Sequence, residues 1–148
     1  MELYDPTAVL SPTTRRVLIT GSRGFPTLDL VDRFVLALPK HLILVHGAAR
    51  GVDQRADGAA RLAGLEIEPH PVSSTRWAVS GPKAGFLRNR RMLQTLRLQT
   101  RDPVVGFWDG VSRGTAGCLD EADALGLPVF VIYPGSKIVL IRWASTAD

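Results

Sequence analysis

Short apolar runs, most of them ending in glycine or another turn residue, alternate along this chain with stretches whose apolar residues recur at helical spacing. The runs are apolar throughout rather than at every second position, which is typical of strands that helices cover on both faces. Regular strand–helix alternation means parallel βαβ units with right-handed crossovers. We therefore expect an α/β fold: a Rossmann-like, doubly wound, mainly parallel sheet of five or six strands with helices on both faces.

The same periods place the expected elements along the chain. Strands are predicted at residues 15–20, 41–47, 65–72, 103–109 and 128–133, with a sixth at 137–143. Helices are predicted at residues 28–38, 52–63, 82–99 and 115–125. Residues 1–14 contain two prolines and show no period. We interpret them as an N-terminal tail that precedes a single domain over residues 15–148.

The composition excludes several classes of protein. Apolar residues make up 45% of the 148 residues and charged residues 22%, as in one soluble globular domain. No apolar run approaches the roughly 20 residues that span a bilayer, and the N-terminus lacks the features of a secretory signal. The single cysteine, Cys118, excludes an internal disulfide and a cysteine-based zinc site. We expect a cytoplasmic protein with no membrane partner, no metal and no cofactor.

Basic residues are concentrated in one segment. The formal net charge is +4, and no acidic residue occurs between Pro69 and Arg101, where seven arginines and lysines lie. Such a local excess favours an anionic partner, either a nucleotide phosphate or a nucleic acid. A solvated helix face would also account for many of these residues.

Three glycine-containing loops, GSRGF (21–25), GAARGVD (47–53) and DGVSRGT (109–115), follow predicted strands. In a doubly wound sheet, ligands bind beyond the carboxyl ends of the strands, so we expect these loops to meet. Glycine allows close approach of the backbone, and a following helix offers free N–H groups and a partial positive charge to an anion. Each loop also contains an arginine, which can bind phosphate oxygens with two donors. The pattern predicts a phosphate in front of Thr115.

Other nucleotide motifs are absent from the sequence. It contains neither G-x-G-x-x-G nor the P-loop pattern, and the second predicted strand ends in His46-Gly47, without an acid that would hold a ribose hydroxyl. A dinucleotide held in the usual way is therefore not expected. Trp77 and Trp108 lie near predicted loops, where each would either stack on a base or serve as a packing group.

Four motifs, GSR, GAARGVD, GFLRNRRM and FWDGVSRGT, occur in an order that resembles the SLOG superfamily. That superfamily unites the Smf/DprA proteins with the LOG-type phosphoribohydrolases, and the closest resemblance is to its small YspA/YpsA-like branch. It implies a Rossmann-like fold, a nucleotide or nucleotide-derived ligand and, as in LOG-type relatives, a homodimer. The matching positions imply a ligand site made of Gly21, Ser22, Arg23, Gly47, Arg50, Gly51, Asp53, Arg88, Asn89, Ser112, Gly114 and Thr115.

One position departs from the LOG-type pattern P-G-G-x-G-T-x-x-E. Cys118 replaces the catalytic glutamate of that pattern, and the P-G-G is absent. Cleavage of an N-glycosidic bond needs a carboxylate near the developing positive charge. Asp53 and Asp109 remain as candidates for that role, with Arg88 as the catalytic arginine that the resemblance implies.

Three functions stay open. The leading hypothesis is a protein that binds a nucleotide-derived ligand, for example as a sensor. The second is a nucleoside monophosphate phosphoribohydrolase that uses Arg88 with Asp53 or Asp109, and the third is single-stranded DNA binding as in DprA. The run at residues 137–143 adds weak support for a homodimer, because an edge strand there would need cover from a second copy or from the tail 1–14.

Overall fold

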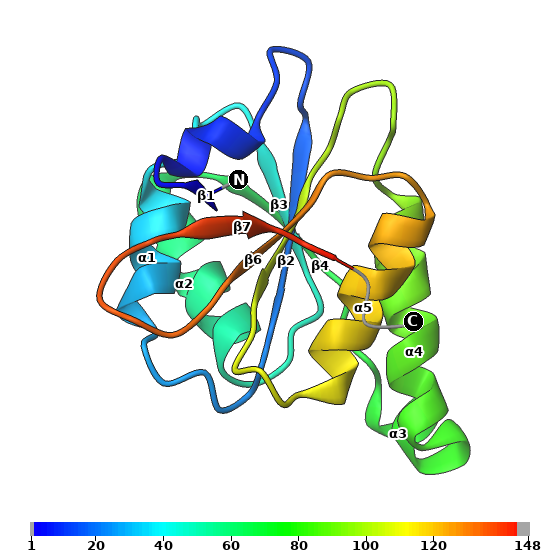
Figure 1. The fold of residues 1–148 in the computed structure, drawn as a ribbon. Helices are drawn as coiled ribbons and strands as arrows, with labels where there is room; N and C mark the ends of the chain where they lie inside the picture. The colour runs from blue at the N-terminus through cyan, green and yellow to red at the C-terminus, as the bar shows by residue number, and fades with distance from the viewer. Residues whose placement is uncertain (1, 145–148) are drawn as a thin grey trace.

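The structure, a computed structural model, describes residues 2–144. Within these residues a seven-stranded sheet has the order β1-β7-β6-β5-β2-β3-β4 (Figure 1). Strands β2 to β6 run parallel, whereas β7 is antiparallel to β6 and β1 is antiparallel to β7. The strands are β1 (Glu2–Leu3), β2 (Arg16–Gly21), β3 (Ile43–His46), β4 (Glu66–Pro69), β5 (Val104–Phe107), β6 (Val129–Ile132) and β7 (Leu140–Arg142).

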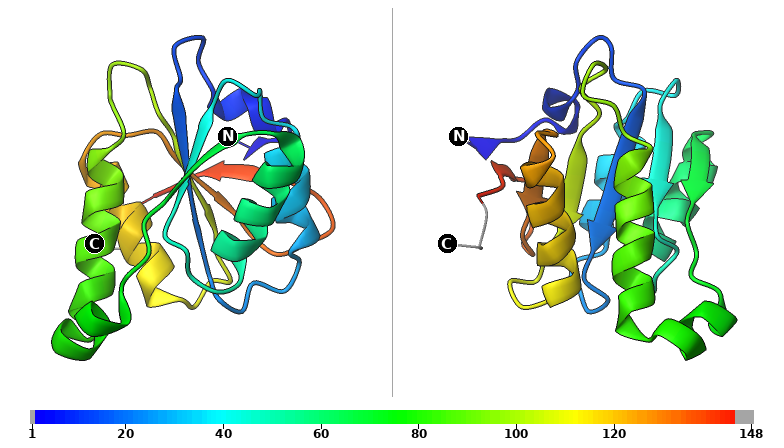
Figure 2. Two further views of the ribbon diagram at one scale, coloured as in Figure 1. Left: turned by 180° about the vertical axis from the view of Figure 1, so that it is seen from behind. Right: turned by 90° about the vertical axis from the view of Figure 1, so that its right-hand side faces the viewer.

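Helices cover both faces of this sheet (Figures 1 and 2). The helices α1 and α2 pack on one face, and α4 and α5 pack on the other. Successive residues of β2 point to opposite faces, so Ile19 lies in the apolar cluster under α1 and α2, and Leu18 lies in the cluster under α4 and α5. The helices are α1 (Asp29–Leu36), α2 (Val52–Ala63), α3 (Ser74–Ser80), α4 (Pro82–Gln94) and α5 (Arg113–Ala124). The expected Rossmann-like α/β architecture is confirmed.

The N-terminal segment differs from the expected tail. Residues Glu2–Leu3 form β1, a short 3-10 helix covers Pro6–Val9, and the Val9 side chain is buried in the core. The sheet consequently has seven strands in the described chain, rather than five or six. The edge of β7 is covered by β1, so the exposed edge that favoured a dimer is occupied by the chain's own N-terminus.

The region from 72 to 102 also differs from the expected single helix. A separate helix, α3, precedes α4, and α4 ends at Gln94 instead of continuing to residue 99. The buried carboxylate of Asp102 explains the early end. It accepts hydrogen bonds from the backbone N–H groups of Arg97, at 3.0 Å, and of Arg15, at 3.0 Å, and so draws this segment toward the start of β2.

The strand order places a topological switch point beside β2. The chain runs outward from β2 to β3 and β4, then returns to β5 on the other side of β2. The loops after β2 and β5 therefore separate at their carboxyl ends and leave a crevice, the usual ligand position in open parallel sheets.

Candidate functional site

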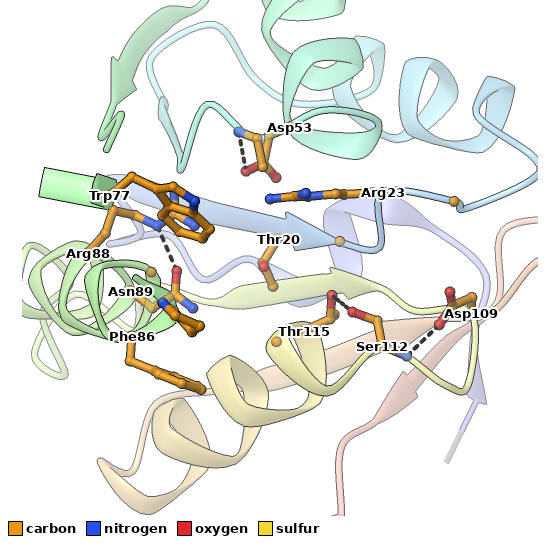
Figure 3. A pocket seen from close by; sticks show the side chains of 16 residues that line it. Thr20, Arg23, Asp53, Trp77, Phe86, Arg88, Asn89, Asp109, Ser112 and Thr115 are labelled. Carbon is orange, nitrogen blue, oxygen red and sulfur yellow. Dashed lines mark hydrogen bonds between the residues drawn. The ribbon is translucent and has the colours of Figure 1, made fainter. Parts of the chain in front are cut away.

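A cavity of about 450 Å³ opens at this switch point (Figure 3). Its volume falls within the range of small-molecule sites. The loops after β2, β3 and β5 contribute to its wall, together with α3 and α4. Among the predicted site residues, those that line it are Gly21, Arg23, Asp53, Arg88, Asn89, Asp109, Ser112, Gly114 and Thr115.

The other predicted residues, Ser22, Gly47, Arg50 and Gly51, are not among the residues that line the cavity. Ser22 is buried, and its hydroxyl accepts a hydrogen bond from the backbone N–H of Asp109 at 3.2 Å, which joins the first loop to the third. Arg50 is exposed. These residues shape or flank the loops, and their predicted contact with a ligand stays a prediction.

The glycines Gly47 and Gly51 make room for neighbouring protein atoms. Gly51 has φ of +81°, and a Cβ at this position would lie 2.5 Å from the carbonyl oxygen of Arg23. A Cβ on Gly47 would lie 2.6 Å from Nη1 of Arg88. The first loop, the second loop and α4 can therefore approach one another only because these positions lack side chains.

Asp109 organises the third loop. Its Oδ1 accepts hydrogen bonds from the backbone N–H groups of Val111, at 2.9 Å, and Ser112, at 2.8 Å. These bonds, with that from Ser112 the strongest influence, lower the pKa of the Asp109 carboxyl. The indole N–H of Trp108 donates a hydrogen bond to the carbonyl oxygen of Ser112 at 2.8 Å and stabilises the same turn. Asp109 thus closes a turn in front of α5.

The N-terminus of α5 faces the cavity. Ser112 is the N-cap residue, but its side chain makes no capping hydrogen bond; its hydroxyl lies 3.2 Å from that of Thr115 instead. Because the first N–H groups of a helix lack partners within the helix, this end carries a partial positive charge. Gly114 and Thr115 line the cavity at this point.

Arg88 ties α4 to the strand ends. Its Nη1 donates to the carbonyl of Gly47 and, at 3.5 Å, to that of His70, while its Nε donates to Oδ1 of Asn89 at 2.8 Å. Burial lowers the pKa of the guanidinium, and the nearby carboxylate of Asp53 acts in the opposite direction. Much of the hydrogen-bonding capacity of Arg88 is therefore used within the protein.

Asp53 lines the cavity and has one carboxylate oxygen without a hydrogen-bond partner. The residue is 4% exposed, and its Oδ2 accepts bonds from the backbone N–H groups of Gly47 and Ala49, each at 3.2 Å. Its Oδ1 is buried and has no hydrogen-bond partner among the described residues. Burial raises the pKa of this carboxyl despite the opposing hydrogen bonds and the charges of His46 and Arg88. A buried polar atom without a partner is rare in native proteins, and a functional role or a bound water or ion is the usual explanation.

Two aromatic rings form the outer wall of the cavity. Trp77 on α3 and Phe86 on α4 line it, although they are 46% and 59% exposed. The sequence offers two tryptophans for base stacking, Trp77 and Trp108. Trp108 packs against Tyr133 and Trp143 and does not line the cavity. Phe86 was not predicted. The sequence indicates its position only through the spacing, because a residue three positions before Asn89 on one helix shares the same helix face.

Cys118, which the resemblance matches to the LOG-type glutamate, lies within α5. It is 2% exposed, and burial raises the pKa of its thiol to about 12. The thiol therefore stays neutral near pH 7 and cannot supply the charge of a carboxylate. Asp53 and Asp109 are the predicted catalytic carboxylates that do reach the cavity.

Residues 2–144 contain no group of three or more histidine, cysteine, aspartate or glutamate side chains placed to hold a metal ion. No helix in this part of the chain has both the length and the apolar character needed to cross a membrane.

Comparison with known proteins finds similarity in fold and in sequence. No family model matches the chain. DNA processing protein A (DprA) from Streptococcus pneumoniae has a similar structure, with a TM-score of 0.67 and 21% identity over 83% of this chain. The match covers 51% of DprA, so this chain spans about half of that protein. The likeness confirms the fold that the SLOG resemblance implied.

The sequence relative is the Gene 61 protein of Mycobacterium phage D29. The two are 39% identical over 122 residues, which make up 78% of this chain and 94% of the phage protein. Identity at this level, over nearly the whole of the relative, indicates common descent. This chain therefore belongs to the same family as the Gene 61 protein of Mycobacterium phage D29.

Proposed function

We propose that this protein binds a nucleotide or nucleotide-derived molecule in the cavity beside β2 and β5, and that it acts as a binding protein or sensor rather than as a hydrolase. One observation carries the proposal. The N-terminus of α5, the guanidinium groups of Arg23 and Arg88, and the rings of Trp77 and Phe86 all meet in that cavity. Together they offer an anion site and a stacking surface to one ligand.

The phosphate is assigned to the end of the cavity formed by α5. There the ligand meets the backbone of Gly114 and Thr115 and the hydroxyl groups of Ser112 and Thr115. The side chain of Arg23 extends into the cavity from the loop after β2 (Figure 3). Hydrogen bonds to a charged group contribute about 1.5–3 kcal/mol each, so these contacts are sufficient for a small anionic ligand.

The base is assigned to the end formed by α3 and α4. Stacking of a base on an aromatic side chain contributes about 1–3 kcal/mol. Trp77 and Phe86 leave apolar ring surface exposed that a base would cover. Asp53, whose buried Oδ1 has no hydrogen-bond partner among the described residues, also lines the cavity.

The carboxylates argue against rapid hydrolysis. The Oδ1 of Asp109 is already bound by two backbone N–H groups. Burial raises the pKa of Asp53, which opposes the negative charge that an oxocarbenium-like transition state requires. If base release does occur, Asp53 is the better candidate, since its Oδ1 is unengaged.

Calorimetric titration with a panel of purine and pyrimidine nucleoside monophosphates tests the proposal. At least one should bind, and Arg23→Ala and Thr115→Ala should each weaken it by roughly tenfold or more. Arg61→Ala is the control, because Arg61 is an exposed arginine on α2 that pairs with Asp57 and does not line this cavity. Binding of no monophosphate, or equal binding by wild type and Arg23→Ala, would contradict the proposal.

The likeness to DprA favours a second candidate, the binding of single-stranded DNA. The segment from Pro69 to Arg101 contains no acidic residue. It exposes four basic residues on α3 and α4, beside the cavity: Arg76, Lys83, Arg90 and Arg91. If single-stranded DNA binds there, a plot of log K against log salt concentration should have a slope of about −0.7 for each phosphate contacted. A steep slope with tight binding near physiological salt would favour this function over a free nucleotide.

We also retain the small YspA/YpsA-like branch of the SLOG superfamily as the proposed place of this family. The four motifs GSR, GAARGVD, GFLRNRRM and FWDGVSRGT support it, and each of them contributes residues that line the cavity.

A further inference from the structure

The side-chain amide of Asn89 is held in one orientation. Nε of Arg88 donates to its Oδ1 at 2.8 Å. A guanidinium has donors only, so the oxygen and not the nitrogen of the amide must face it. Nδ2, with its two N–H donors, is left for other partners, and Figure 3 shows it on the side turned away from Arg88. Asn89 lines the cavity and is half-buried.

The same amide lies between the two aromatic rings. Gly85 and Phe86 precede Asn89 by four and three residues on α4, so all three share one helix face. A Cβ on Gly85 would lie 3.7 Å from Cζ3 of Trp77, which places that ring over the helix one turn before Asn89. Figure 3 shows the amide between Trp77 and Phe86. A base stacked on either ring would direct an edge at Asn89.

We infer that Asn89 selects the base and favours bases with a keto oxygen at purine C6 or pyrimidine C4 (hypoxanthine, guanine and uracil) over bases with an amino group at that position (adenine and cytosine). This inference rests on the proposed function and deepens it. The usual asparagine–adenine pair uses both the amide oxygen and the amide nitrogen. Here Arg88 engages the oxygen, so the amide acts as a donor. A keto oxygen at purine C6 or pyrimidine C4 accepts such a bond, whereas an amino group at that position, placed opposite the amide nitrogen, would set donor against donor.

The unpartnered Oδ1 of Asp53 does not offset the preference for a keto oxygen. Oδ1 of Asp53 could accept from an amino group, but Figure 3 shows Asp53 at the opposite end of the cavity from Phe86. A base stacked on Phe86 therefore presents its edge to Asn89 rather than to Asp53.

Two pairs of nucleotides test the inference, because members of each pair share size and phosphate and differ in the keto or amino group. Inosine monophosphate should bind about tenfold more tightly than adenosine monophosphate, and uridine monophosphate about tenfold more tightly than cytidine monophosphate. In Asn89→Asp, one carboxylate oxygen pairs with Arg88 and the other becomes an acceptor. The order within each pair should then reverse, even if the added negative charge weakens all four nucleotides.

Gln94→Glu is the matched control. Gln94 is an exposed residue at the end of α4 that does not line the cavity, and this change makes the same conversion of amide to carboxylate. It should leave both preferences unchanged. If wild type binds all four nucleotides with equal affinity, the inference is wrong although the proposed function stands. If the Asn89→Asp variant folds and still binds the keto member of each pair more tightly, Asn89 does not cause the preference. Binding of none of the four would refute the proposed function itself.

Discussion

Replacement of Gly51 by alanine should destabilise the protein strongly. The residue has φ of +81° and ψ of −117°, a conformation that costs a residue with a Cβ about 1–3 kcal/mol. The new Cβ would also lie 2.5 Å from the carbonyl oxygen of Arg23, a backbone atom that cannot rotate away. Overpacking of this kind costs about 1–3 kcal/mol. The sum, about 2–6 kcal/mol, is a large part of the 5–15 kcal/mol that stabilises a typical domain.

Urea unfolding followed by circular dichroism measures this loss. Gly58→Ala is the control, since Gly58 is an exposed residue inside α2 and no atom outside its immediate helix surroundings lies within 4 Å of the added Cβ. That variant should gain about 0.5–1 kcal/mol, because alanine is the better helix former. A free energy of unfolding for Gly51→Ala within about 0.5 kcal/mol of wild type would refute the proposed close contact between the first and second loops.

Three further predictions concern other parts of the chain. The thiol of Cys118, buried and with its pKa raised to about 12, should react with a thiol reagent near pH 8 far more slowly in the native protein than in urea; equal rates would show that it is accessible. Asp109→Asn should lose at most about 1 kcal/mol near pH 7, because solvent screens this carboxylate. The pKa of Asp109 is lowered on folding, so its contribution is present above the unfolded value near 3.9 and disappears as the pH falls through the folded value. A difference between wild type and variant that stays constant from pH 7 to pH 2 would contradict this account. Light scattering tests the homodimer: a dimer must use a surface other than the β7 edge, which β1 covers, and a monomer would refute the prediction.

The parallel core of the fold was predictable because its strands and helices differ clearly in apolar period. Two of the features that were missed, β1 and the end of α4, depend on distant contacts. Two-residue β1 has no periodic signal and exists because β7 pairs with it. The end of α4 depends on Asp102, whose partners include the backbone of Arg15, far away in sequence.

The site was predicted in part for the same reason. Loop motifs identified Arg23, Asp53 and Thr115, because glycine-bearing strand ends must meet at one edge of a parallel sheet. They did not separate residues that face the cavity from those, such as Ser22, that join one loop to another. Phe86 was missed because an aromatic residue on a helix is usually a packing group, and only the tertiary structure shows it exposed at a cavity.

In the proposed complex a phosphate binds at the N-terminus of α5 while a base lies against α4. A titration of ¹⁵N-labelled protein with inosine monophosphate, followed by NMR, tests both contacts at once. We expect large shifts of the backbone amides of Gly114 and Thr115 and of the side-chain amide of Asn89. Inorganic phosphate should shift the two backbone amides and leave Asn89 unchanged. Shifts confined to the exposed arginines of α3 and α4, with these three amides unmoved by either compound, would contradict the proposed complex.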